Sequence, residues 1–128
     1  MNTSNKEKEL LYLQSYASIV FIITIFVSLI LTINNIKKQN NTKRFFSAKT
    51  ENQINYINRI IITILAITFT YINYSFYEIS KQKNNVTIQK DEYIASILTL
   101  VAGFILLYTT TQSIKNNVNS LNIDSPLI

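Results

Sequence analysis

The chain contains no cysteine, histidine or tryptophan, and only one glycine and one proline among its 128 residues. The lack of cysteine excludes disulfides and thiolate chemistry, and the lack of both cysteine and histidine excludes most zinc sites. An enzyme that activates water without histidine, cysteine or clustered acids would be unusual, and the sequence has no phosphate-binding loop. We therefore expect a protein that is not an enzyme and that uses no metal and no cofactor.

Charged residues are missing from three long stretches of the chain. Residues 10–36, 60–77 and 93–114 form uncharged runs of 27, 18 and 22 residues. A membrane-spanning helix needs about 20 mostly apolar residues, with a usual range of roughly 17–25. Strands are disfavoured because turn residues do not interrupt these runs and because a lone strand is not viable in lipid. The sequence predicts an all-α integral membrane protein, with three transmembrane helices in a small bundle with short loops.

The uncharged runs also predict where each segment begins and ends. The first run is too long for a cleaved signal peptide and has no small-residue cleavage site, so we expect it to remain in the membrane. Asp91 is expected to cap the third helix. The predicted order is a polar N-terminal tail (1–9), a first transmembrane helix (10–35), a basic loop (36–56), a second transmembrane helix (57–78), a polar loop (79–91), a third transmembrane helix (92–114) and a polar C-terminal tail (115–128).

The loop after the first predicted helix carries five cationic residues within thirteen positions. Short cytoplasmic loops of membrane proteins are enriched in lysine and arginine, so this loop and the C-terminus are predicted to face the cytoplasm and the N-terminus to lie outside. Nucleic acid is not expected as a partner, because nothing in the sequence builds a folded basic face or a stacking platform. The residues expected to contact the head groups of anionic lipids are Lys37, Lys38, Lys43, Arg44 and Lys49.

Isoleucine, asparagine, lysine, tyrosine and phenylalanine together make up 64 of the 128 residues, and lysine outnumbers arginine ten to two. These five residue types have A/T-rich codons, so the composition is typical of an AT-rich genome. Asparagine runs such as Asn34-Asn35 are therefore given little weight as structural signals.

Small and hydroxylated residues recur at helical spacing within the predicted spans. Such stripes let two helices approach closely and let hydroxyls hydrogen-bond across the interface. They fit two interpretations, in which these faces pack against one another or identical subunits arrange them around an aqueous lumen. Asn73 stands out, because an amide in an apolar span seeks a partner and can fix register or oligomeric state. The candidates for helix association or for lining a lumen are Thr24, Ser28, Thr63, Thr70, Asn73, Thr99, Gly103 and Thr110.

The three uncharged runs contain no ionisable residue that could relay protons or ions, which counts against a pump or a proton-coupled transporter. The first hypothesis is a non-catalytic multi-pass membrane protein that acts by helix–helix association, as a small structural or accessory subunit of a membrane-embedded assembly. The alternative is a small oligomeric pore-former or membrane-disrupting effector, similar in scale to a holin. A transporter half that dimerises is a weaker third hypothesis. The expected partners are a bilayer with anionic head groups and either further copies of this chain or other membrane subunits.

Overall fold

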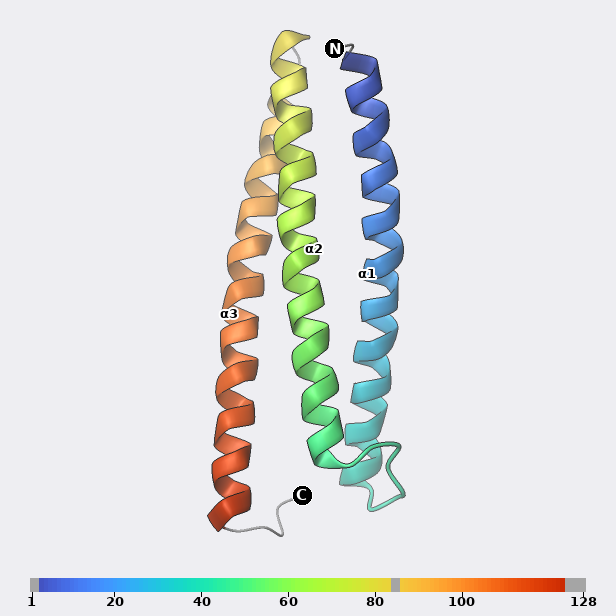
Figure 1. The fold of residues 1–128 in the computed structure, drawn as a ribbon, viewed down its shortest axis with the longest axis vertical. Coiled ribbons are helices and arrows are strands. Elements are labelled where there is room, and N and C mark those ends of the chain that lie inside the picture. The colour runs from blue at the N-terminus through green and yellow to red at the C-terminus, as the bar shows by residue number, and fades with distance from the viewer. Residues whose placement is uncertain (1–2, 84–85, 124–128) are drawn as a thin grey trace.

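The structure, a computed structural model, describes residues 3–83 and 86–123, with side chains for residues 4–83 and 86–116. Within these residues it contains no strand and three helices, α1 (Thr3–Gln39), α2 (Ala48–Gln82) and α3 (Thr87–Ile123). Each helix runs antiparallel to the next, and α2 lies between the other two (Figure 1). In the described part of the chain, α2 contacts both α1 and α3, which make no close backbone contact with each other. The predicted all-α fold is confirmed.

All three helices are long and apolar enough to cross a membrane, and α2 is the least apolar of them. α1 contains 37 residues. At 1.5 Å per residue its length is about 55 Å, against about 30 Å for the hydrocarbon core of a bilayer. Each helix therefore extends beyond its uncharged run.

Parts of the segments that we expected to be tails and loops are helical, because no glycine or proline interrupts them. Asp91 does not cap α3, since the helix begins four residues earlier and the Lys90 amide already donates to the Val86 carbonyl at 2.8 Å. Of the predicted tails and loops, residues 1–2, 84–85 and 124–128 lie outside the described residues. The helical parts are 3–9, 36–39, 48–56, 79–82, 87–91 and 115–123.

Buried positions recur every seven residues in each helix. This spacing corresponds to 3.5 residues per turn, the repeat of left-handed coiled coils. Most of these positions hold small or polar side chains, which allow close helix approach. The buried positions that follow this repeat are Leu10, Ala17, Thr24 and Leu31 in α1, Glu51, Asn58, Leu65, Ile72 and Ile79 in α2, and Ser96, Gly103 and Thr110 in α3.

Large apolar side chains mostly point away from the other helices. Phe26 and Leu98, for example, are 60% and 65% exposed. A cluster of buried apolar side chains joins α1 to α2 near the start of α1, where Leu10 packs with Ile72 and Ile79. Because lipid tails are as apolar as leucine, helix association in a membrane depends on packing and on polar contacts rather than on the hydrophobic effect. The polar contacts between these helices are therefore expected to contribute much of their association.

The connection between α1 and α2 is built without glycine. Asn41 adopts a positive φ of 57° just after α1. The Thr42 amide donates to the Lys37 carbonyl at 2.9 Å and the Asn41 amide to the Lys38 carbonyl at 3.3 Å, which is the Schellman pattern at a helix C-terminus. Ser47 then caps α2, because its hydroxyl accepts a hydrogen bond from the Thr50 amide at 3.2 Å. Asparagine here occupies the position that glycine commonly takes.

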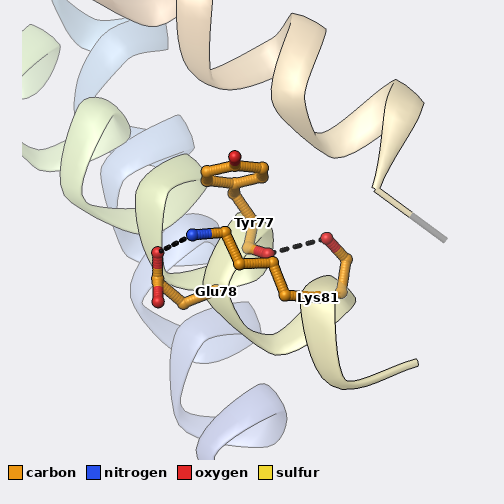
Figure 2. Close-up of polar contacts among 4 residues, drawn as sticks. Tyr77, Glu78 and Lys81 are labelled. Atoms are coloured by element: carbon orange, nitrogen blue, oxygen red, sulfur yellow. Dashed lines mark hydrogen bonds and ion pairs between the residues drawn. The ribbon is translucent and has the colours of Figure 1, made fainter. Parts of the chain in front are cut away.

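Lysines and tyrosines join the helices at the opposite end of the molecule. Lys81 pairs with Glu78 at 3.0 Å, and its ammonium group lies 4.6 Å from the centre of the Tyr77 ring (Figure 2). The Tyr77 ring stacks on Tyr93 of α3 at 5.8 Å. Lys83 pairs with Glu7 of α1. These contacts link all three helices through aromatic and ionic groups at one end.

Candidate functional site: the faces of α2 and the groove beside it

Asn58 makes the main polar contact between α1 and α2. Its side-chain amide donates to the Thr24 carbonyl at 3.3 Å and to the Ser28 hydroxyl at 3.1 Å. Asn58 is 4% exposed and Thr24 is 2% exposed. The amide is thus enclosed between the helices, and it brings together two of the predicted association residues, Thr24 and Ser28.

Asn34 holds the start of α2 against the end of α1. Its side chain is fully buried and makes two hydrogen bonds with the backbone of Phe46. The Phe46 amide donates to Oδ1 at 3.1 Å, and Nδ2 donates to the Phe46 carbonyl at 3.4 Å. Phe46 lies in the loop, so its backbone amide and carbonyl have no partner within a helix. The Asn34 side chain satisfies both groups.

Asn73, Thr70 and Ser96 meet between α2 and α3. The Asn73 amide donates to the Ser96 hydroxyl, which itself donates to the Glu92 carbonyl at 2.9 Å. The Thr70 hydroxyl donates to the Ala66 carbonyl at 2.7 Å and approaches the Ser96 carbonyl at 3.3 Å. Asn73 thus has a partner inside its own chain, on a neighbouring helix.

Gly103 of α3 faces Thr63 of α2. A Cβ atom added at this residue would lie 3.9 Å from Oγ1 of Thr63. Thr63 is buried, and its hydroxyl donates to the Arg59 carbonyl of its own helix at 2.9 Å. Thr110, one heptad beyond Gly103, is also buried and donates to the Leu106 carbonyl. Ser96, Gly103 and Thr110 therefore form the face that α3 turns towards α2.

The remaining predicted association residue, Thr99, does not belong to that face. It is exposed, and its hydroxyl donates to the Ala95 carbonyl at 2.9 Å. Ala95 and Ala102 are exposed on the same side of α3. The small residues of α3 thus form two neighbouring stripes, of which one packs on α2 and the other remains uncovered within the chain.

The uncovered stripe lines a groove that runs along α2 between α1 and α3. The groove has a volume of about 500 Å³ and mostly apolar walls. Asn73 and Glu92 lie at one end, while Ile62 and Leu106 lie towards the other. Phe21 is its contribution from α1, and its further lining residues are Leu65, Ala66, Phe69, Ala95, Ser96, Thr99, Ala102 and Gly103.

No protein-family model, no curated protein and no solved structure matches this chain. What the molecule can do is therefore inferred from its own geometry. The coarse result is plain: three apolar helices of membrane-spanning length indicate a small membrane protein.

The basic residues of the predicted head-group site gather at the loop end of the molecule. Lys38, Lys43 and Lys49 are exposed, while Lys37 and Arg44 are partly covered. The Lys37 ammonium lies 5.0 Å from the centre of the Phe45 ring, and that ring is 57% exposed. The loop therefore presents an aromatic ring beside cationic groups, an arrangement that suits a membrane interface.

The structure also shows the position of Arg59 along the axes of α1 and α3. In the sequence, Arg59 directly precedes the uncharged run of its own helix. Asn58, its neighbour, contacts Thr24, which lies 15 residues after Glu9 and 13 before Lys37. On the other side, Thr63 lies beside Gly103, at the middle of the uncharged run of α3. Arg59 is thus within about 6 Å of the midpoint of both runs, at 1.5 Å per residue.

An ionisable group, Arg59, therefore lies level with the uncharged runs of both neighbouring helices, a placement that the uncharged runs themselves did not predict. Its physical cause is the register of the helices, because α2 is displaced along its axis relative to the uncharged runs of α1 and α3. The polar residues Asn55 and Asn58 are level with apolar parts of the neighbouring helices, whereas Tyr74 and Tyr77 are level with their charged ends. The uncharged run of α2 is therefore not level with the uncharged runs of α1 and α3.

Replacing Asn58 with leucine should weaken the contact of α1 with α2 by about 1–2 kcal/mol, because hydrogen bonds between membrane helices contribute on that order. The effect is measurable as a change in fluorescence transfer between labels on α1 and α2 in bicelles. Asn55→Leu is the matched control, since the Asn55 side chain makes no hydrogen bond within the described residues. Equal effects of the two substitutions would contradict a specific role for the Asn58 amide.

Proposed function

We propose that this chain is a non-catalytic multi-pass membrane protein that acts by helix–helix association, as a small structural or accessory subunit of a membrane-embedded assembly. The observation that carries the proposal is the groove between α1 and α3, along which α3 exposes Ala95, Thr99 and Ala102. Small residues at this spacing allow another helix to approach closely in lipid. The groove thus offers a packing surface that no helix of the described chain covers.

Orientation forms part of this proposal. The N-terminus lies outside and the C-terminus faces the cytoplasm, together with the loop between α1 and α2. At the opposite end, ion pairs compensate Lys81 and Lys83, whereas no ion pair involves the described lysines of the loop. If Arg59 is left out of the count, six cationic residues lie at the loop end and five at the other end. The predicted orientation therefore depends on the excess of cationic residues in the loop that follows α1.

A pore is the alternative, in which the exposed hydroxyls would face an aqueous lumen. The hydroxyls of Thr63, Thr99 and Thr110 each donate to a carbonyl one turn earlier in the same helix. Thr63 and Thr110 are also buried within the described chain rather than exposed, which supports the packing role over a lumen. A pore formed by this chain would nevertheless depolarise the membrane that contains it, so the two functions predict different measurements.

The first test measures the membrane potential of bacteria that express this chain alone. The potential is monitored by the fluorescence of a voltage-sensitive dye, after insertion of the chain into the membrane has been confirmed. We expect the potential to remain intact, because packed hydroxyl stripes conduct no ions. Prompt depolarisation with growth arrest would instead establish the pore and refute the accessory role.

The second test asks whether the groove is covered by another helix in the membrane. Because the chain has no cysteine, single cysteines can be introduced without background. A photoreactive benzophenone attached to Ala102→Cys should cross-link efficiently to a neighbouring chain when membranes that contain the assembly are illuminated. Phe104→Cys is the control, since Phe104 is exposed on the opposite face of α3. Similar cross-linking at the two positions would mean that the groove is not a preferred surface.

A further inference from the structure

The side chain of Arg59 has no partner among the residues that the structure describes. Its Nε atom is buried without a hydrogen bond, and the guanidinium forms no ion pair. Arg44 and Glu51 also bury an unpartnered atom, but they lie near the charged loop end of the molecule. Arg59 alone combines such an atom with a position near mid-span. Ionisable groups at this depth are costly and normally pair with another group.

Among the residues that the structure describes, no carboxylate of this chain lies within reach of Arg59. Glu7, Glu9, Glu78, Asp91 and Glu92 all lie towards the end of the molecule where α1 begins. Glu51 lies eight residues from Arg59 along α2, a distance of about 12 Å. In a second copy the described carboxylates would again lie towards one end or the other, whether the copies were parallel or antiparallel. The described carboxylates therefore do not explain the position of Arg59, and a different protein is the source that we consider for a carboxylate at this depth.

Arg59 does not line the groove itself, but its position on α2 lies next to one end of it. The groove residues of α2 that face α3 include Ile62, Ala66, Phe69 and Asn73, which follow steps of four, three and four. Arg59 continues this row by one further step of three, so it lies on the same face of α2, just beyond Ile62. A helix that packs along the groove would pass this side chain.

We propose that the groove receives a transmembrane helix of a different protein, which carries an aspartate or glutamate at mid-membrane depth, and that Arg59 pairs with that carboxylate. The inference rests on the proposed accessory function and adds the chemistry of its partner. Arginine suits this role, because its planar guanidinium binds a carboxylate through two parallel hydrogen bonds.

A lipid phosphate is a less suitable partner for Arg59. Lys115 lies twelve residues from Gly103, and Arg59 lies four residues from Thr63 on the facing helix. The guanidinium-bearing residue is therefore about 12 Å deeper than the level where α3 becomes charged, at 1.5 Å per residue.

The test uses the full chain in phosphatidylcholine vesicles and synthetic leucine-based transmembrane helices, with binding followed by fluorescence transfer from a label on Asn116→Cys. One probe helix carries a single central aspartate and the other a central leucine. We expect the aspartate probe to bind about tenfold more tightly, since a buried charge pair exceeds an ordinary polar contact between helices. Arg59→Leu should abolish that difference, whereas Lys115→Leu, which removes a cation at the end of α3, should preserve it.

A charge reversal guards against misfolded variants. Arg59→Asp should lose the preference for the aspartate probe and acquire one for a probe with a central arginine. Equal binding of the aspartate and leucine probes to the unaltered chain would overturn the role of Arg59 but leave association in the groove intact. Ala102→Ile, which fills the groove, should weaken both probes equally. If neither probe binds the unaltered chain, both the groove and the Arg59 proposal fail.

Lipid pairing is the remaining outcome, and it has its own measurement. Solid-state NMR can detect a short distance between the Arg59 guanidinium carbon and lipid phosphorus in the same vesicles. Such a contact, together with equal binding of the two probes, would assign Arg59 to the lipid head groups and refute the proposed carboxylate partner. We expect no such contact when the aspartate probe is bound.

Discussion

Replacing Asn34 with alanine is expected to destabilise the packing of α1 on α2 by about 2–4 kcal/mol, because each buried polar group left without a partner costs about 1–3 kcal/mol. The substitution removes both hydrogen bonds to Phe46 and leaves its amide and carbonyl unsatisfied. The free energy of separating the two helices can be measured by steric trapping in bicelles, with biotin labels on cysteines introduced at exposed positions of each helix.

Asn35 provides the matched control for this experiment. It is the adjacent asparagine, it is exposed, and its side chain makes no hydrogen bond within the described residues. Asn35→Ala should change the separation energy by less than about 0.5 kcal/mol, as is usual for surface positions. A similar loss at both positions would show that asparagine contributes here through helix propensity or solvation rather than through the contacts with Phe46.

At Gly103 the size of the substituted side chain should decide the result. Gly103→Leu is expected to cost about 3 kcal/mol in the packing of α3 on α2, the upper part of the range for overpacking a close contact. Gly103→Ala should be tolerated within about 0.5 kcal/mol, because its Cβ would lie at an ordinary contact distance of 3.9 Å from Thr63. Steric trapping with labels on α2 and α3 measures both values.

The comparison of the two variants separates packing from backbone effects. Both replace glycine within a helix and both raise helix propensity, so a loss confined to leucine identifies the contact with α2 as its cause. A combined Gly103→Leu and Thr63→Ala variant should recover part of the loss, since the smaller residue leaves more room. If Gly103→Leu were neutral, α3 would not pack on α2 through the face that contains Ser96, Gly103 and Thr110.

The position of Arg59 would connect the stability of the α1–α2 contact to the proposed binding of a partner helix. Asn58 uses its amide to join α1 and α2, and in doing so it fixes the register that holds the neighbouring arginine near mid-span. The substitutions in the interface of α1 and α2 are therefore expected to affect partner binding as well as packing. Arg59→Leu, in contrast, should affect partner binding while the three helices remain associated.

Several local features could be predicted from the sequence because they depend on short segments. The helices follow from the uncharged runs, since a span of this length in lipid must satisfy its own backbone. The heptad of α2 is also visible once its polar members, Glu51 and Asn58, are counted with Leu65, Ile72 and Ile79. The apolar and small residues of α2 alone do not reveal this heptad. Asn34 was missed because asparagine is abundant in this chain, and abundance conceals a residue with a specific contact.

The sequence by itself determined the class of protein, since the absence of charge over three long runs is enough to require membrane-length helices. Only the tertiary structure decided which small residues pack, which remain uncovered, and at what depth each polar residue lies. The physical reason is that helical periodicity places Ser96 and Thr99 on neighbouring faces of α3, and either face can receive another helix. Which face packs depends on the neighbouring helix and on its axial register. Arg59 illustrates this, because its position relative to the apolar parts of the bundle follows from α1 and α3 and not from its own helix.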